Sequence, residues 1–133
     1  IAGKRVAVLD DSIVRGTTSR QIVAMLFEAG AKEVHFLVSS PPVIFPDFYG
    51  IDTPEQKYLI AADKSVEEIR EYLGATSLTF LSYEGMMKAT GLDEKLFCTS
   101  FFTGEYPIDI GDRRKEFQAK KICYTPFAAE RNA

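Results

Sequence analysis

The chain has 133 residues, of which 46% are hydrophobic and 26% are charged, and its formal net charge is −3. This length and balance are typical of one soluble domain, or a piece of a larger one, that buries an apolar core without disulfides or a structural metal. The acidic balance excludes a general nucleic-acid surface, because such surfaces need many Lys and Arg side chains acting together.

The first elements predicted along the chain are a strand, a loop and a helix. An apolar run over residues 6–9, bounded by charged residues, predicts a buried parallel strand. The polar, glycine-containing stretch 10–17 predicts a loop. Apolar residues at helical spacing then predict a helix over 18–29, with Thr17 or Thr18 as its N-cap.

A second strand is expected over 34–38, after Gly30 has ended the first helix. Strand, helix and strand in such close succession predict a right-handed parallel βαβ unit. Ser65-Val66-Glu67-Glu68 reads as a capping box. Residues 97–106 are aromatic and turn-rich, and no element is assigned to them. The other elements expected are helices over 55–62, 65–73, 83–90 and 113–121, and a strand over 77–81.

The loop between the first strand and the first helix carries the residues with chemical potential. A helix N-terminus presents unpaired N–H groups and the positive end of the helix dipole, which suits a phosphomonoester. Gly16 would let the backbone approach phosphate oxygens without an intervening Cβ. The hydroxyls of Ser12, Thr17 and Thr18 could donate hydrogen bonds. These features predict a phosphate-binding loop over 10–18.

Two carboxylates, Asp10 and Asp11, stand beside this phosphate site. They could accept hydrogen bonds from the vicinal hydroxyls of a sugar, or they could hold Mg²⁺, which bridges to phosphate. A ribose 5-phosphate carries both kinds of group. The alternative interpretation is a strand that ends in two solvated acids, followed by ordinary turn and cap residues. Neither a Walker G-x-x-x-x-G-K-[ST] pattern nor a Rossmann G-x-G-x-x-G pattern is present.

An apolar strand followed by Asp10-Asp11-Ser12-Ile13-Val14-Arg15-Gly16-Thr17-Thr18-Ser19 resembles the phosphoribosylpyrophosphate-binding signature of type I phosphoribosyltransferases. More specifically, it resembles the glutamine phosphoribosylpyrophosphate amidotransferase family (amidophosphoribosyltransferases). Further matching blocks are Ser39-Ser40-Pro41-Pro42, Phe48-Tyr49-Gly50-Ile51-Asp52, Ser65-Val66-Glu67-Glu68-Ile69 and Phe102-Thr103-Gly104-Glu105-Tyr106-Pro107.

The resemblance implies an α/β type I phosphoribosyltransferase fold, a parallel sheet with flanking helices, that is incomplete at its N-terminus. Residues 1–108 would be the C-terminal part of the phosphoribosyltransferase domain, with the phosphate loop at 10–18. Residues 109–133 would be the C-terminal helix and tail of the same domain.

The resemblance also implies a glycosyltransferase reaction of purine biosynthesis. Ammonia displaces pyrophosphate at the anomeric carbon of phosphoribosylpyrophosphate and gives 5-phosphoribosylamine. The ammonia comes from glutamine in a glutaminase domain of the same chain, which begins with a cysteine nucleophile. Because this sequence begins with Ile1, that domain and the front of the transferase domain are expected to be missing. The isolated fragment is therefore expected to be inactive.

By the same resemblance, Asp10 and Asp11 would serve the ribose hydroxyls and Mg²⁺, and which of them lies nearer the metal stays open. Residues 12–18 would cradle the 5-phosphate. No catalytic residue is implied, because ammonia delivered unprotonated needs no base and catalysis would rest on positioning and charge stabilisation. The implied substrate-binding residues are Asp10, Asp11, Ser12, Ile13, Val14, Arg15, Gly16, Thr17 and Thr18.

Some members of the family carry an iron–sulfur cluster on cysteines. Here Asp47 stands at one such position, and of a C-x-x-C pair only Cys98 remains, with Phe101 at the other place. One thiolate does not hold a cluster normally bound by four, so no cluster is expected. Cys98 and Cys123 are expected to be buried as small apolar residues.

Two alternatives share the fold: a phosphoribosylpyrophosphate-sensing transcriptional regulator and a salvage phosphoribosyltransferase acting on a free base. The acidic charge argues against the regulator, and the later matching blocks argue against both. The two distant cysteines favour a reducing cytoplasm, and no apolar run approaches the roughly 18 residues of a membrane span. The expected partners are phosphoribosylpyrophosphate, the glutaminase domain and, when intact, further copies of the chain, but neither nucleic acid nor membrane.

Overall fold

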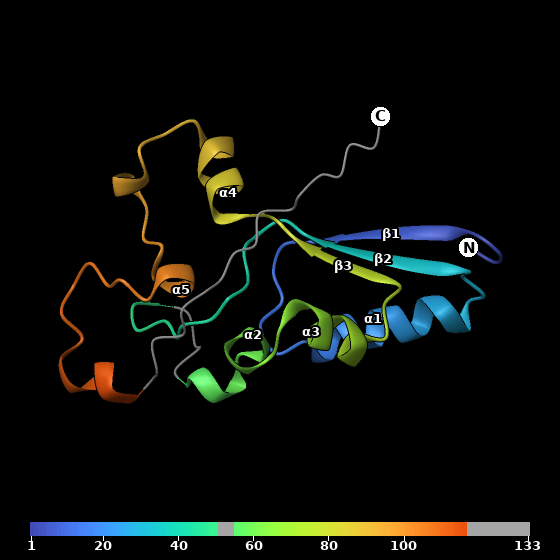
Figure 1. The fold of residues 1–133 in the computed structure, drawn as a ribbon, viewed down its shortest axis with the longest axis horizontal. Coiled ribbons are helices and arrows are strands. Elements are labelled where there is room, and N and C mark those ends of the chain that lie inside the picture. The colour runs from blue at the N-terminus through green and yellow to red at the C-terminus, as the bar shows by residue number, and fades with distance from the viewer. Residues whose placement is uncertain (51–54, 117–133) are drawn as a thin grey trace.

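The computed structural model describes residues 1–50 and 55–116. Its centre is a parallel sheet in the order β1-β2-β3, which confirms the predicted α/β class and the βαβ unit (Figure 1). No helix in these two ranges is long and apolar enough to cross a membrane. The strands are β1 (Arg5–Asp10), β2 (Glu33–Val38) and β3 (Ser77–Phe80).

The helices are distributed unevenly around the sheet. Helices α1 (Thr17–Glu28) and α3 (Val66–Leu73) lie on the same side of it, and α4 (Tyr83–Thr90) and α5 (Ser100–Thr103) lie beyond the carboxyl ends of the strands (Figure 1). One sheet face is therefore covered by helices. The remaining helical elements are α2 (Ile60–Asp63) and three 3₁₀ helices, Gln56–Tyr58, Glu94–Leu96 and Gly111–Glu116.

The core lies between the sheet and the two long helices. Its buried members from the strands and from α1 and α3 are Val34, Phe36, Val38, Leu78, Val23, Ile69 and Leu73. The opposite sheet face carries the alternate residues, and among the described elements no helix packs on it. Leu9 is 76% exposed there.

The predicted burial of the first strand on both faces is thus wrong. Successive side chains of a strand point to opposite faces, and the helices cover only one of them. Within the described residues β1 pairs only with β2, so it is also an edge strand.

The predicted capping box of α3 is confirmed. Ser65 Oγ accepts the N–H of Glu68, and the Glu68 carboxylate accepts the N–H of Ser65. Gly74 ends this helix in the left-handed region, which agrees with the predicted end at residue 73. Ser82 and Gly91 bound α4 in the same manner. Hydroxyl N-caps and glycine C-caps satisfy the groups that a helix leaves unpaired at its ends.

Two predictions for the shorter helices need correction, and one segment without a predicted element contains a helix. The helix expected over 55–62 is two short pieces, because Leu59 between them is extended (φ −85°, ψ 111°). The segment 97–106, left unassigned, contains α5. The helix expected over 113–121 is a 3₁₀ helix as far as Glu116, and the rest of that range lies outside the described residues. Thr53-Pro54, which the sequence allows as the start of the helix over 55–62, also lies outside them.

Candidate functional site

The predicted phosphate loop lies at the carboxyl end of the sheet. It leaves β1 after Asp10 and enters α1 at Thr17. The backbone carbonyl of Asp10 accepts hydrogen bonds from the N–H and the hydroxyl of Ser39, at 2.9 and 3.1 Å. This ties the base of the loop to the end of β2. In open α/β sheets, ligands bind outside the carboxyl ends of the strands, so the loop occupies the expected place.

The start of α1 carries no side-chain cap. Its N-cap is Gly16, in the left-handed region with φ +76°, and the first turn contains no acidic residue. The prediction that Thr17 or Thr18 caps the helix is therefore wrong, because the helix begins one residue earlier. The first helical hydrogen bond runs from the Arg20 N–H to the Gly16 carbonyl, at 2.9 Å. The N–H groups before it remain available to an anion.

Two residues of the loop are fixed to the body of the domain. Ile13 is 1% exposed and belongs to the hydrophobic core. The carbonyl of Val14 accepts the N–H of Ile60 at 2.9 Å. The side chain of Ile13 therefore anchors the loop, while the N-terminus of α1 stays at the surface.

Gly16 faces the helical layer. A Cβ added to it would lie 2.9 Å from Ile60 Cδ1 and 3.2 Å from Tyr72 Cε1. From the sequence, a Cβ at this position is expected to block the approach of a phosphate. In the structure it would also crowd the side chains of Ile60 and Tyr72. A glycine is required here by its positive φ and by close packing.

The two acids of the loop form a chain of short-range hydrogen bonds. The N–H of Asp11 donates to Asp10 Oδ1 at 3.0 Å, and the N–H of Ser12 donates to Asp11 Oδ1 at 2.6 Å. In the described part of the protein neither carboxylate forms an ion pair, and Oδ2 of each is available. Mg²⁺ binds one or two carboxylates and keeps several waters, so this donor set fits it.

Arg15 is exposed, and its side chain lies over the ring of Tyr58. Its guanidinium lies 5.4 Å from the centre of the Tyr58 ring, and Lys57 lies 4.9 Å from the same centre. Such cation–π contacts contribute about 0.5–1 kcal/mol at exposed sites. Sequence reasoning missed Tyr58, because nothing in the local pattern of 55–62 indicates a contact with residue 15.

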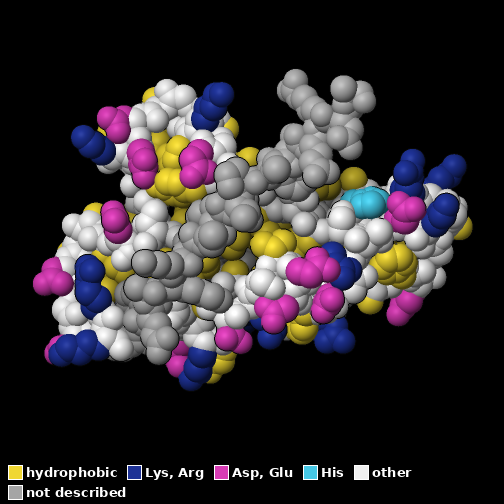
Figure 2. Space-filling model, viewed as in Figure 1, with side chains coloured by type: hydrophobic (Ala, Val, Ile, Leu, Met, Phe, Trp, Pro, Cys, Tyr) yellow, Lys and Arg dark blue, Asp and Glu magenta, His cyan; other side chains and the backbone are white. Residues whose placement is uncertain are grey.

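His35 lies outside this site, on the uncovered sheet face, where Figure 2 shows it in cyan. Its Nδ1 lies 2.8 Å from Ser77 Oγ, and its Nε2 lies 3.1 Å from Glu33 Oε2. The first contact links β2 to β3 and the second lies within β2, so the residue has a structural role here.

Two distant blocks of the sequence meet in what we call the clasp, formed by residues 44–49 and 98–108. The N–H groups of Ile44 and Phe45 both donate to the Phe101 carbonyl, at 2.9 and 3.0 Å. The hydroxyl of Tyr106 donates to the Pro46 carbonyl at 2.8 Å. Burial raises the pKa of Tyr106 to about 12.

The clasp is also where cluster-ligating cysteines would be needed. Asp47 is 6% exposed, and its Oδ2 accepts the N–H of Gly50 at 2.9 Å. Cys98 is exposed, with Sγ 3.3 Å from Ser100 Oγ, so the prediction of a buried thiol is wrong for this residue. It lies in an exposed stretch before α5; Cys123 falls outside the described residues. The residues present do not fit an iron–sulfur cluster.

We therefore expect protein purified without oxygen to contain neither iron nor acid-labile sulfide above background. The carboxylate of Asp47 and the phenyl ring of Phe101 supply no thiolate where a cluster would need one. Colorimetric assays of both elements, with the visible absorption spectrum as a control, make the measurement. Stoichiometric iron together with sulfide would contradict the prediction.

Solved structures resemble this arrangement closely. Glutamine phosphoribosylpyrophosphate amidotransferase from B. subtilis, complexed with ADP and GMP, matches with a TM-score of 0.77 and 56% identity over 83% of this chain and 25% of that one. A structure described as the allosteric regulatory enzyme of purine biosynthesis matches with a TM-score of 0.78 and 49% identity, over 89% of this chain and 27% of the other. The fold of this chain is therefore that of an α/β domain of the phosphoribosyltransferase type.

Curated sequences lead to the same family. Amidophosphoribosyltransferases of Synechococcus elongatus and Bacillus subtilis are each 56% identical, over 86% and 83% of this chain. Amidophosphoribosyltransferase 2, chloroplastic, of Arabidopsis thaliana is 56% identical over 81%. No protein-family model matches. The chain is a homologue of the amidophosphoribosyltransferases, and it spans 19–24% of the length of these three relatives.

Proposed function

We propose that this chain supplies the phosphoribosylpyrophosphate-binding part of an amidophosphoribosyltransferase. The reaction would be the first step of de novo purine synthesis, in which glutamine-derived ammonia and phosphoribosylpyrophosphate give 5-phosphoribosylamine. The observation that carries the proposal is the N-terminus of α1, without a side-chain cap, on the same loop as two carboxylates that form no ion pair with any described residue. Homology to enzymes of that name supports it.

The 5-phosphate would bind at the start of α1. The N–H groups of the first turn and the hydroxyls of Ser12, Thr17 and Thr18 would donate to its oxygens, and the helix dipole favours its charge. Hydrogen bonds to a charged partner are about twice as strong as neutral ones. This loop would therefore provide most of the binding energy and fix the position of the ribose.

The carboxylates of Asp10 and Asp11 would orient the sugar and hold Mg²⁺. When bound, Mg²⁺ would neutralise charge on the pyrophosphate group that leaves. The nitrogen of ammonia would form a bond to the anomeric carbon while the carbon–oxygen bond to pyrophosphate breaks. The electron pair of the broken bond would leave with pyrophosphate, and the new ammonium group would release one proton to pyrophosphate or to solvent. The residues of this chain would contribute by holding the ribose in line for that exchange.

The partners of the intact enzyme follow from the same proposal. A glutaminase domain in the same longer chain would supply ammonia, and further copies of that chain would complete a homo-oligomer. We place the bacterial type of this enzyme in the cytoplasm; one of the plant relatives is named as chloroplastic. The chemistry proposed involves neither nucleic acid nor membrane.

The proposal can be tested with a pair of ligands, ribose 5-phosphate and inorganic phosphate. In ¹H–¹⁵N spectra at millimolar Mg²⁺, both ligands are expected to shift the amide signals of Gly16 and Thr17. Replacing both Asp10 and Asp11 by Asn should weaken ribose 5-phosphate binding by about tenfold or more, because charge-assisted bonds to the ribose hydroxyls are lost. Binding of inorganic phosphate should stay equal or improve, since like charge near the site is removed.

Two results would contradict this assignment. A spectrum that ribose 5-phosphate leaves unchanged in the wild-type protein would show that the loop is no phosphate site. Equal weakening of both ligands by the Asn variant would show that the acids do not act on the ribose.

A further inference from the structure

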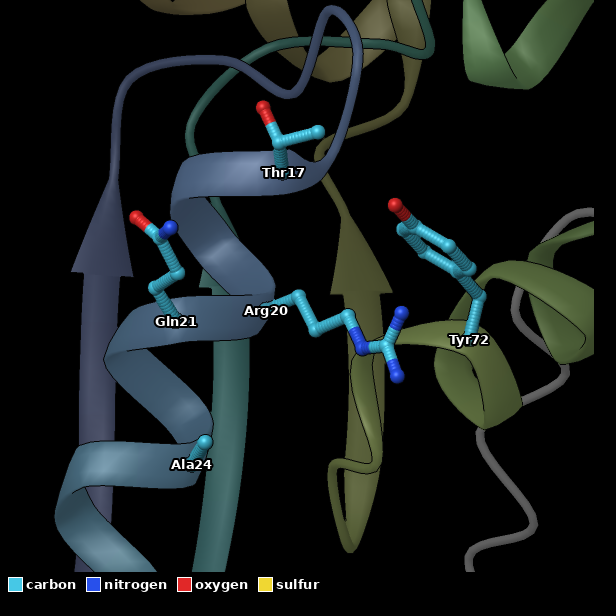
Figure 3. A pocket seen from close by; sticks show the side chains of 5 residues that line it. All are labelled: Thr17, Arg20, Gln21, Ala24 and Tyr72. Atoms are coloured by element: carbon cyan, nitrogen blue, oxygen red, sulfur yellow. The ribbon is translucent and has the colours of Figure 1, made fainter.

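The ring of Tyr72, on α3, lies behind the phosphate loop. The Cβ that Gly16 lacks would lie 3.2 Å from Tyr72 Cε1 and 3.5 Å from Cδ1. Arg20, in the first turns of α1, reaches across from the other helix, and its guanidinium lies 5.2 Å from the centre of the same ring (Figure 3). Tyr72 therefore lies next to Gly16 of the loop and stacks with Arg20 of the helix that the loop begins.

The surroundings of this ring are open. An open hollow of about 300 Å³, lined by residues of α1 and by Tyr72 of α3, lies beside the ring, and Tyr72 is only half-buried. The ring packs against the hydrophobic core, beside Gly16, and Arg20 lies over its face. The residues that line the hollow are Thr17, Arg20, Gln21, Ala24 and Tyr72.

The loop needs support at this point because of its glycine. A glycine populates positive and negative φ about equally, so Gly16 does not by itself select the value of +76° seen here. On one side the conformation is restrained by Ile60, whose N–H binds the Val14 carbonyl and whose Cδ1 lies against Gly16. On the other side the restraint is the ring of Tyr72.

We propose that Tyr72, stacked on Arg20, is a positioning residue for phosphate binding. It holds Gly16 in the left-handed conformation and so aims the first N–H groups of α1 at one point. The ring contacts the loop and not the ligand, and its effect is to lower the ordering cost of binding. The inference rests on the proposed function, since it presumes that the loop binds phosphate.

The test compares Tyr72→Ala with Tyr72→Phe and with Ile69→Val. Inorganic phosphate is titrated against each variant, and the shift of the Gly16 amide signal gives the affinity. Tyr72→Ala is expected to weaken binding by about three- to tenfold, and Tyr72→Phe, which keeps the ring, should restore it. Ile69 is buried on the same helix, and its truncation lowers stability without touching Gly16. Ile69→Val should therefore bind phosphate as the wild type does.

A double-mutant cycle separates two effects of Arg20 on phosphate binding: its stacking on the Tyr72 ring and its positive charge. Arg20→Gln should weaken phosphate binding in the wild type, and by a smaller factor in the Tyr72→Ala background, because the stack is already gone. The inference would be contradicted if Arg20→Gln weakened phosphate binding by the same factor in both backgrounds. It would also be contradicted if Tyr72→Ala bound phosphate with wild-type affinity, or if Ile69→Val weakened phosphate binding as much as Tyr72→Ala does. In those cases the proposed function stands. A wild-type protein without any phosphate-dependent shift would instead refute the proposed function.

Discussion

Replacing Gly16 by Val is expected to weaken ribose 5-phosphate binding by at least about a hundredfold, the loss of two or three hydrogen bonds to a charged group. Valine does not adopt a φ of +76° without strain, and its β-branch adds to that strain. Its Cβ would also press on Ile60 and Tyr72. Both effects displace the N–H groups that would meet the phosphate. Gly16→Ala should lose less, because Ile60 Cδ1 is the mobile end of its side chain.

The measurement is a calorimetric titration of ribose 5-phosphate, with circular dichroism to confirm folding. Gly3→Val is the matched control: Gly3 also has a positive φ, +69°, but a Cβ there meets nothing within 4 Å, and the residue lies before β1. The control carries similar backbone strain and should bind as the wild type. If folded Gly16→Val protein bound ribose 5-phosphate as tightly as the wild type, the loop would not be the phosphate cradle.

Replacing Ile13 by Ala is expected to lower the free energy of unfolding by about 2–5 kcal/mol, the usual cost of removing a buried aliphatic side chain. Ile13 is 1% exposed and packs in the core although it lies in the middle of the loop. The loss would leave a cavity under the loop that we propose to bind phosphate. Ile13→Val should cost about 0.5–1.5 kcal/mol, since it removes one methylene.

Urea denaturation followed by circular dichroism measures these differences. Leu9→Ala is the control, because Leu9 is an aliphatic residue of similar size close in sequence but 76% exposed. Its replacement should change the free energy of unfolding by no more than about 0.5 kcal/mol. Equal losses for Ile13→Ala and Leu9→Ala would show that Ile13 does not anchor the loop.

The local features of the fold were predictable from the sequence. Periodicity and cap residues predicted the strands, α1, α3 and α4, because these signals lie within a few neighbouring residues. The capping box at Ser65 is the clearest example. The phosphate loop was also predictable, since its acids, glycine and hydroxyls are consecutive. Its assignment as a binding site is still a proposal.

Features that depend on distant neighbours were not predictable. An apolar run such as 6–9 reads the same whether one or both faces of a strand are covered, so the exposure of Leu9 could not be foreseen. The contacts of Gly16 with Ile60 and Tyr72 join three separate elements. No local pattern in the sequence indicates which side chain will lie behind a glycine.

The clasp has a consequence for how the chain folds. Pro46 and Tyr106, which it joins, are 60 positions apart, and Tyr49 and Ile108 are 59 apart. Closing so long a loop costs more chain entropy than pairing β1 with β2 across a single helix. The βαβ unit with its phosphate loop should therefore form early, and the clasp late in the folding reaction. Substitutions in the clasp would then accelerate unfolding and leave the folding rate nearly unchanged.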